Sequence, residues 1–151
     1  MKSQLLHQQN GEKTFAVIFD KGDEVVAGLQ GFAHAQQLSA AYFTAIGAFS
    51  DVTLGYFERE RKDYKKIPLH EQVEVLTLVG NIACSQGRPK VHAHVVVGTA
   101  TGMAHGGHLL EAHVWPTLEV VVESPQHLRR TMDEETGLAL IQLETTRRPQ
   151  A

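Results

Sequence analysis

The pattern that most restricts the fold is a pair of histidines set in a run of valines. His92 and His94 are separated by one residue, and Val91 and residues 95–97 flank them. β-Branched residues favour strands, and side chains two residues apart in a strand point to the same face. The segment is therefore predicted to be a strand that presents two imidazoles on one face.

A third histidine follows this strand at hairpin distance. His108 comes directly after Gly106 and Gly107, where the backbone can bend without a side-chain penalty. Three neutral imidazoles that converge form a zinc-type site with an open fourth position. We therefore expect zinc or a similar divalent transition metal at His92, His94 and His108. The alternative is that these are half-buried surface histidines bonded to neighbouring carbonyls.

Size and charge narrow the class of protein. The 151 residues are 42% hydrophobic and 21% charged, which fits one soluble globular domain without a membrane span. The net charge is −3 with the histidines neutral, and the basic clusters at 59–66 and 129–130 are small. Strong DNA binding by one isolated chain is therefore not expected.

The expected compartment is the cytoplasm. The N-terminus has no apolar core of signal-peptide length, and Cys84 is the single cysteine, so no intrachain disulfide can form. We expect Cys84 to be a small core residue. We expect His7, His70 and His127 at the surface, and His105 facing away from His108.

Hydrophobic periodicity predicts an α+β fold of antiparallel β-sheets with one main amphipathic helix. The helix is expected over 24–37 with Asp23 as its cap, and the segment 73–82, apolar on both faces, as a strand covered on both sides. The expected strands are 14–19, 40–57 (bent, entering a hairpin), 64–69, 73–82, 91–97, 103–110 and 113–123, with a bulge or edge at Pro116 and short pieces at 128–132 and 138–143. The expected domain limits are an N-terminal extension 1–13, a domain 14–144 and a frayed tail 145–151.

Several separated motifs resemble the PPC domain, the plant and prokaryote conserved domain. They are Gly80-Asn81-Ile82, the histidine strand with Gly87-Arg88-Pro89 before it, Gly106-Gly107-His108-Leu109-Leu110-Glu111 and Glu119-Val120-Val121-Val122. The resemblance covers most of residues 14 to 144. It implies a homotrimer, a metal at His92, His94 and His108, and a regulatory or DNA-associated function with possible protein partners.

Two departures from the plant pattern bear on function. The chain has no separate AT-hook, because Gln86 stands where the first arginine would be and Gly87-Arg88-Pro89 is expected in a turn. Glu71 and Gln72 replace a Gly-Arg-Phe type sequence, which weakens the case for plant-type partner contacts. The expected form is the stand-alone prokaryotic type, in which a trimer could gather basic residues from three chains.

Two alternatives use the open coordination position. The first is a metal-dependent enzyme in which Glu111 acts as a general base or a fourth ligand, although no catalytic residue can be assigned and the glutamate of a cupin motif is missing after His94. The second is a small-molecule sensor with the metal at a subunit boundary and Tyr56 and Trp115 as apolar walls.

Overall fold

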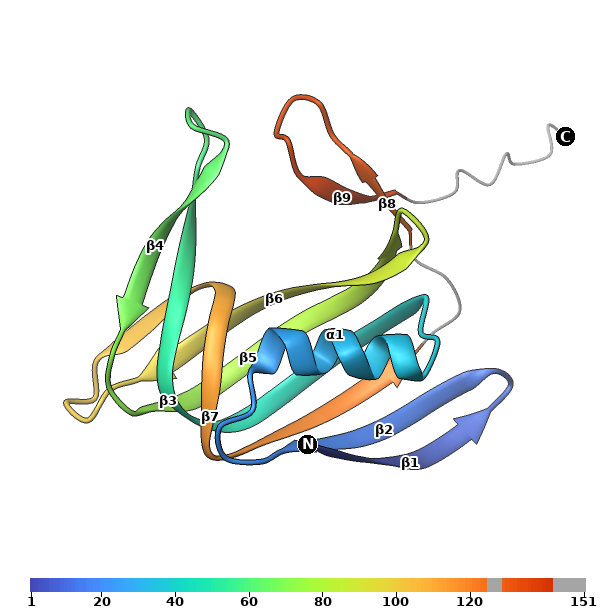
Figure 1. Ribbon diagram of the computed structural model, residues 1–151, viewed down its shortest axis with the longest axis horizontal. Coiled ribbons are helices and arrows are strands. Elements are labelled where there is room, and N and C mark those ends of the chain that lie inside the picture. Colours follow the sequence, from blue (N-terminus) through green and yellow to red (C-terminus); the bar gives the residue numbers. More distant parts are fainter. Residues whose placement is uncertain (125–128, 143–151) are drawn as a thin grey trace, which may run out of the picture.

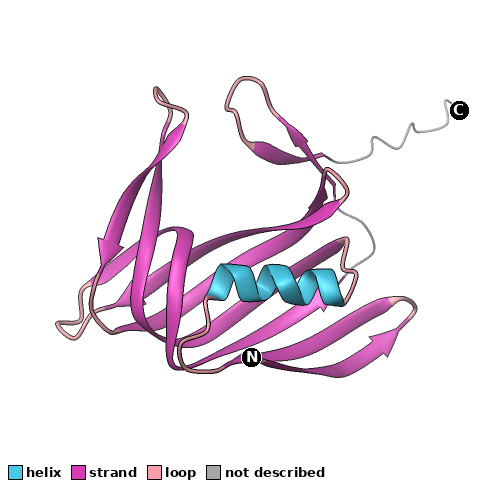
Figure 2. Cartoon of the chain, viewed as in Figure 1, coloured by secondary structure: helices cyan, strands magenta, loops and turns pink. Residues whose placement is uncertain are grey.

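The computed structural model describes residues 1–124 and 129–142, which form one strongly curved β-sheet with a single helix packed against it (Figures 1 and 2). The elements are β1 (Lys2–Gln9), β2 (Glu12–Phe19), α1 (Val25–Ala35), β3 (Ala40–Glu58), β4 (Asp63–Leu69), β5 (Val73–Ser85), β6 (Arg88–Gly98), β7 (Ala104–Ser124), β8 (Arg129–Met132) and β9 (Ala139–Gln142). The mostly antiparallel sheet with one helix confirms that part of the predicted fold class. In the described residues, no helix is long and apolar enough to cross a membrane.

The sheet closes on itself around four strands. Its order is β1-β2-β7-β3-β5-β8-β9, β4 pairs with β3, and β6 pairs with both β5 and β7. The pairs β3–β5, β5–β6, β6–β7 and β7–β3 therefore complete a circuit, and all four are antiparallel. One parallel contact, Cys84 with Arg129, attaches β8 to β5. Strand β6 is therefore held along both edges, which fixes the histidine segment from two sides.

Helix α1 covers the inner face of the sheet. Its N-cap is Glu24, whose carboxylate accepts from the backbone N–H groups of Val26 (3.0 Å) and Ala27 (2.5 Å). The predicted cap, Asp23, instead accepts from the Asp20 N–H at 2.9 Å and pairs with the N-terminal ammonium. The wrong cap has a simple cause, since Glu is a weaker sequence signal for a cap than Asp.

The core lies between α1 and the sheet. The predicted helical stripe is confirmed: the buried helical residues are Val25, Leu29, Phe32 and Ala33, and Val26 is partly buried. Phe32 meets Phe15 of β2 edge to face, with ring centroids 5.3 Å apart. Burying an aliphatic or aromatic side chain of this size stabilises the fold by about 1.5–3 kcal/mol each.

The two longest strands, β3 and β7, bend together at one place. Gly47 has φ +150° and pairs with Leu118, and a Cβ on Gly47 would lie 2.3 Å from the Thr117 carbonyl oxygen. Phe49 pairs with Val114, so three residues of β7 oppose one of β3 in this bulge. The bulge predicted at Pro116 is confirmed, and glycine at 47 allows the two backbones to approach this closely.

Some elements differ from the sequence-based expectations. Residues 2–9 form strand β1 on the edge of the sheet, although no strand was predicted in residues 1–13. In β5 the register shifts between Val75 and Thr77, so Leu78 is buried and Val79 is exposed. Val73 and Val75 are buried before this shift, so the alternation along the strand changes phase at the bulge. His127 and the tail 145–151 lie outside the described residues.

Two hairpins project from the same side of the sheet, β3–β4 and β8–β9 (Figure 1). Lys62 at the first tip donates from Nζ to the carbonyl oxygen of Glu134 at the second, at 3.1 Å. The space between the hairpins is thus bounded at its outer end by this contact.

The predicted turn at 86–89 is present as Gln86 and Gly87, both with positive φ, between β5 and β6.

Candidate metal centre

The three histidines of the sequence motif come together on neighbouring strands. On β6, Ala93 and Val95 are buried in the core, so His92 and His94 point to the opposite face. On β7, His108 pairs directly with His94. The hairpin between β6 and β7 therefore returns the third imidazole to the first two.

The imidazoles are close enough to share one ion. Each offers a ring nitrogen within 4.8 Å of those of the other two. The ring centroids are 5.2 Å apart for His92 and His94, 5.0 Å for His92 and His108, and 5.3 Å for His94 and His108. One chain supplies all three side chains.

The protonation state of the histidines also suits metal binding. Burial, as the largest cause, lowers the pKa of His92, with Arg130 and His94 adding to the effect. Burial and the two other imidazoles lower the pKa of His108 to about 4. Nδ1 of His108 is buried and has no hydrogen-bond partner. A neutral imidazole with an unused nitrogen is the form that binds a divalent transition metal, so these residues fit such an ion.

Two side chains outside the motif hold the imidazoles in place. The ring of Tyr64, from β4, stacks on His108 with centroids 4.6 Å apart and planes 22° from parallel. The guanidinium of Arg130, from β8, lies beside His92, with Nη2 3.3 Å from Nδ1. The same Nη2 donates to the side chain of Asn81, and Nη1 donates to the Ala139 carbonyl at 2.7 Å. Burial lowers the pKa of Arg130.

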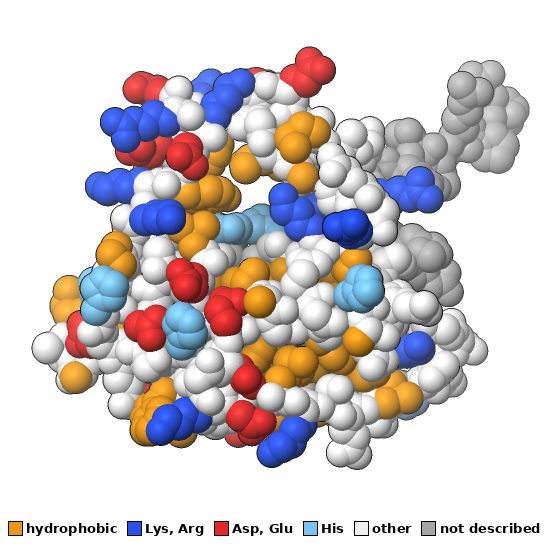
Figure 3. Space-filling view, viewed as in Figure 1, with side chains coloured by type: hydrophobic (Ala, Val, Ile, Leu, Met, Phe, Trp, Pro, Cys, Tyr) orange, Lys and Arg blue, Asp and Glu red, His pale blue; other side chains and the backbone are white. Residues whose placement is uncertain are grey.

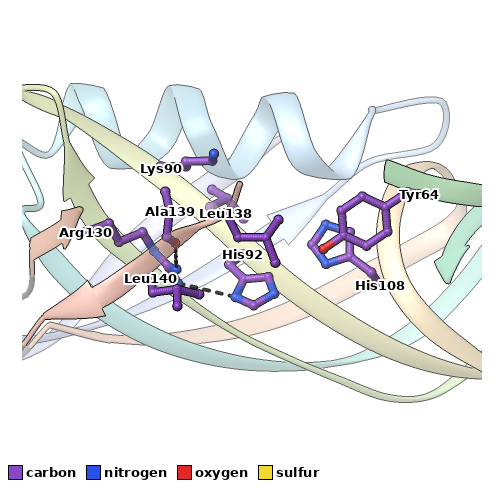
Figure 4. Close-up of a pocket in the computed structure, with 9 residues that line it drawn as sticks. Tyr64, Lys90, His92, His108, Arg130, Leu138, Ala139 and Leu140 are labelled. Atoms are coloured by element: carbon purple, nitrogen blue, oxygen red, sulfur yellow. Dashed lines mark hydrogen bonds between the residues drawn. The ribbon is translucent and has the colours of Figure 1, made fainter. Parts of the chain in front are cut away.

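A cavity of about 130 Å³ opens beside the histidines. Its lining comes from β4, β6, β7, β8, β9 and the turn before β9, and includes His92, His108, Tyr64 and Arg130 (Figure 4). In the space-filling view, histidine side chains lie in the hollow between the projecting hairpins, with Lys and Arg side chains on both sides (Figure 3). The histidine site is thus accessible to a small ligand.

Several residues considered from the sequence lie elsewhere. Glu111 and His105 are not part of the three-histidine cluster, and Glu111 acts instead on His113, whose pKa it helps to raise. Tyr56 is 66% exposed and Trp115 lies beneath Lys21, and neither lines the cavity. As apolar walls of a ligand site at a subunit boundary, the two residues stay a prediction.

Sequence reasoning missed Tyr64 and Arg130 as parts of the site. Arg130 lies 38 residues from His92 in the sequence, and it reaches the site only because β8 attaches beside β5. Tyr64 reaches His108 because β4 folds back on β3, which pairs with β7. Neither residue belongs to a short motif, so no spacing could have indicated its position.

A second polar cluster lies near the start of α1. His113 and Asp51 join through Nδ1 and Oδ1 at 2.8 Å, and Ser50 donates to the other carboxylate oxygen at 2.8 Å. The hydrogen bond to Asp51 is the main cause that raises the pKa of His113, and the same bond lowers the pKa of Asp51. This pair is separate from the three-histidine centre.

Comparison with known proteins gives a family match and several similar structures. The model of the Plants and Prokaryotes Conserved domain matches residues 6–125. A plant- and prokaryote-conserved protein from Pyrococcus horikoshii is 29% identical, with a TM-score of 0.82 over 96% of this chain and 97% of its own. A metal-containing protein from Archaeoglobus fulgidus is 36% identical, with a TM-score of 0.79 over 87% and 94% of the two chains.

The names of two further similar proteins indicate different functions. A candidate DNA-binding protein from Bacteroides thetaiotaomicron is 26% identical, with a TM-score of 0.83 over 94% of this chain and 98% of its own. The bifunctional protein GlmU of Synechococcus sp. (strain JA-3-3Ab) is 32% identical over 127 residues, which is 82% of this chain. The chain spans only about a fifth (19%) of that curated relative's length.

Proposed function

The chain belongs to the Plants and Prokaryotes Conserved domain family, and on that premise we propose that it is a regulatory, metal-bearing homotrimer. Zinc or a similar divalent transition metal is held by His92, His94 and His108. The observation that carries this proposal is the convergence of three imidazoles, two with lowered pKa values, within 4.8 Å. The metal-containing relative from Archaeoglobus fulgidus supports it.

The three-histidine donor set leaves room for a further ligand. Three protein nitrogens are typical of zinc sites that keep an open position. An ion held there would supply Lewis-acid chemistry toward an oxygen ligand from the cavity. The protein's own part is to keep His92 and His108 neutral and oriented, through burial and through the stacked ring of Tyr64.

The test is metal content of the purified chain. Elemental analysis after zinc loading and desalting is expected to give about one ion per chain. The double variant H92A/H94A should lose it, while H7A/H70A, which removes two exposed histidines outside the cluster, should keep it. No ion in the wild type, or equal content in both variants, would contradict the proposal.

Assembly as a homotrimer is supported by apolar side chains on the outer face of the sheet. Tyr42, Ile46, Val79 and Val121 are each at least 40% exposed there. Exposed apolar residues grouped on one face commonly mark a protein interface. Sedimentation should give three times the chain mass of 16.7 kDa, and I46K/V121K should sediment as a monomer. A wild-type protein that sediments as a monomer would contradict the proposed homotrimer.

DNA contact is a second candidate, favoured by the name of the Bacteroides relative and by one surface feature. The outer part of the β3–β4 hairpin carries basic side chains with acids interspersed and one ion pair, Arg61 with Glu58 at 3.2 Å. The basic residues are Arg59, Arg61 and Lys62 at the tip, and Lys65 and Lys66 on β4. A trimer would present three such tips. A mobility-shift assay at low salt should show a complex that K65Q/K66Q weakens, and no shift with an intact trimer would exclude direct binding.

The alternative of a metal-dependent enzyme or a small-molecule sensor is favoured by the cavity beside the histidines. These two functions are distinguished by incubating the zinc-loaded protein with small-molecule ligands. Conversion of a ligand to product would indicate an enzyme, and binding without conversion would indicate a sensor. A cytoplasmic location is part of the proposal, since a single cysteine cannot form an intrachain disulfide.

A further inference from the structure

Arg130 lies half-buried beside the histidines, and no carboxylate of the described residues pairs with it. Its Nη1 and Nη2 groups donate to the neutral oxygens of Ala139 and Asn81, and within residues 1–124 and 129–142 it forms no ion pair. Its Nε is buried and makes no hydrogen bond. A desolvated cation that lacks a counter-charge is unfavourable, so the site is suited to an anion supplied from outside the chain.

The cavity around Arg130 has the same preference. Among the residues that the structure describes, its lining contains two cationic side chains, Lys90 and Arg130, and neither aspartate nor glutamate. Apolar side chains, among them Val91, Leu138 and Leu140, make up much of the rest (Figure 4). An ion at the three histidines would add further positive charge. The lining thus favours an anion that also carries an apolar part.

The size of the cavity limits the ligand. Its volume of about 130 Å³ is well below the roughly 300–1,000 Å³ of pockets for drug-sized molecules. A nucleotide is therefore too large to be enclosed. A carboxylic acid of a few carbon atoms matches both the volume and the mixed lining.

We propose that this cavity binds a small organic carboxylate, which lies against the cationic guanidinium of Arg130 beside the three-histidine centre. The inference rests on the proposed function and names the ligand class of the same site. A planar guanidinium donates directed N–H hydrogen bonds to carboxylate oxygens, which the ammonium group of a lysine cannot reproduce. Nη1 continues to hold Ala139, so the β8–β9 hairpin stays in place while the anion binds.

The experiment is a calorimetric titration of the zinc-loaded and the metal-free full chain at constant ionic strength. The probes are acetate, propionate and butyrate, with inorganic phosphate as the competing oxyanion. We expect saturable binding of a carboxylate to the zinc-loaded wild type. R130Q should weaken it about 10- to 100-fold, because hydrogen bonds to charged groups contribute in that range.

Two further variants separate the effect of the positive charge of Arg130 from the effects of its planar guanidinium and of misfolding. R129Q removes the exposed neighbouring arginine on the same strand and should leave the affinity unchanged. R130K keeps the positive charge but loses the planar guanidinium, so it should also weaken carboxylate binding. It therefore serves as the test if R130Q fails to fold. A cobalt-loaded sample gives a second readout, since a carboxylate that reaches the ion changes its visible absorption spectrum.

The outcomes distinguish this inference from the metal proposal. Zinc binding without carboxylate binding, or equal affinity in R130K and the wild type, overturns the inference and leaves the metal centre intact. Phosphate binding tighter than every carboxylate overturns the assignment to carboxylates. If zinc does not bind, the metal proposal fails, and the metal-free titration decides: binding that R130K weakens supports the anion site, and no binding overturns it.

Discussion

His94 and His108 face each other directly across the β6–β7 ladder, with ring centroids 5.3 Å apart and ring planes at 86°. A slip of one residue in this register would move one imidazole to the opposite face of the sheet. The candidate centre therefore depends on strand register more than on any loop.

Removing the ring that stacks on His108 should weaken metal binding. The Tyr64 ring lies parallel to His108 at 4.6 Å and limits its rotation. We expect Y64A to lower zinc affinity about tenfold, the lower end of the effect of groups that orient metal ligands. Y64F should keep the wild-type affinity. Y56A, at a tyrosine outside the cavity, is the matched control, and competition with a chromophoric chelator measures all four proteins. An equal affinity in Y64A and the wild type would mean that Tyr64 has no positioning role.

A side chain at position 47 should destabilise the sheet. A Cβ there would lie 2.3 Å from the Thr117 carbonyl oxygen and 2.8 Å from Cα of Leu118, in a backbone with φ +150°. We expect G47A to lower the free energy of unfolding by about 2 kcal/mol or more. Urea denaturation measures the change, and a loss below about 0.5 kcal/mol would show that the bulge can open.

The matched control for that variant is G31A, on the exposed side of α1. A Cβ at Gly31 meets nothing within 4 Å, and its φ is not in the left-handed region. Alanine in a helix interior is more favourable than glycine by about 0.5–1 kcal/mol. The same substitution should therefore stabilise the protein here and destabilise it at 47.

The His113–Asp51 pair should stabilise the fold only in mildly acidic solution. The raised pKa of His113 means that its contribution is complete below the unfolded value near 6.5 and is lost as the pH rises through the folded pKa. The lowered pKa of Asp51 means that its contribution is present above about 3.8 and is lost as the pH falls through its folded pKa. The window thus lies between about pH 4 and 6.5.

A double-mutant cycle of H113Q and D51N measures this coupling. Both side chains are about 40% exposed (38% and 42%), so solvent screening keeps the expected coupling below about 1 kcal/mol. It should be detectable at pH 5.5 and absent at pH 8.5. Equal coupling at both pH values would show that the histidine charge plays no part.

Loss of the helix cap should have a moderate cost. The Glu24 carboxylate accepts from Val26 and Ala27, and its Oε1 lies 3.4 Å from the Ala112 N–H of β7. We expect E24A to lower the free energy of unfolding by about 1 kcal/mol, as for other caps. D23A should lose less, since Asp23 does not cap the helix. A larger loss in D23A than in E24A would reverse this assignment.

The sequence predicted those parts of the site that lie close together in the chain. His92 and His94 follow from alternation within one strand, and His108 from the next strand of the same hairpin. Arg130 and Tyr64 could not be predicted, because their positions depend on β8 attaching to β5 and on β4 folding back on β3. Such long-range pairings leave no periodic signal in the sequence.

The same distinction holds for the fold. The buried stripe of α1 was readable because helical spacing repeats over the whole element. Strand β1 was missed because all of its residues are exposed and show no alternation of buried and exposed side chains. In β5 the register shift after Val75 reversed an alternation that looked regular in the sequence. The domain limits 14–144 stay a prediction.

The short connection between β6 and β7 has a consequence for how the chain folds. Only residues 99–103 separate the two strands, and the Thr99 N–H donates to the Met103 carbonyl at 2.9 Å. The pairing of β3 with β7, by contrast, joins Tyr42 to Glu123 across 81 positions. Closing a short loop loses less chain entropy and is faster than closing a long one. The three imidazoles therefore belong to a local hairpin that can form without the long-range pairing of β3 with β7.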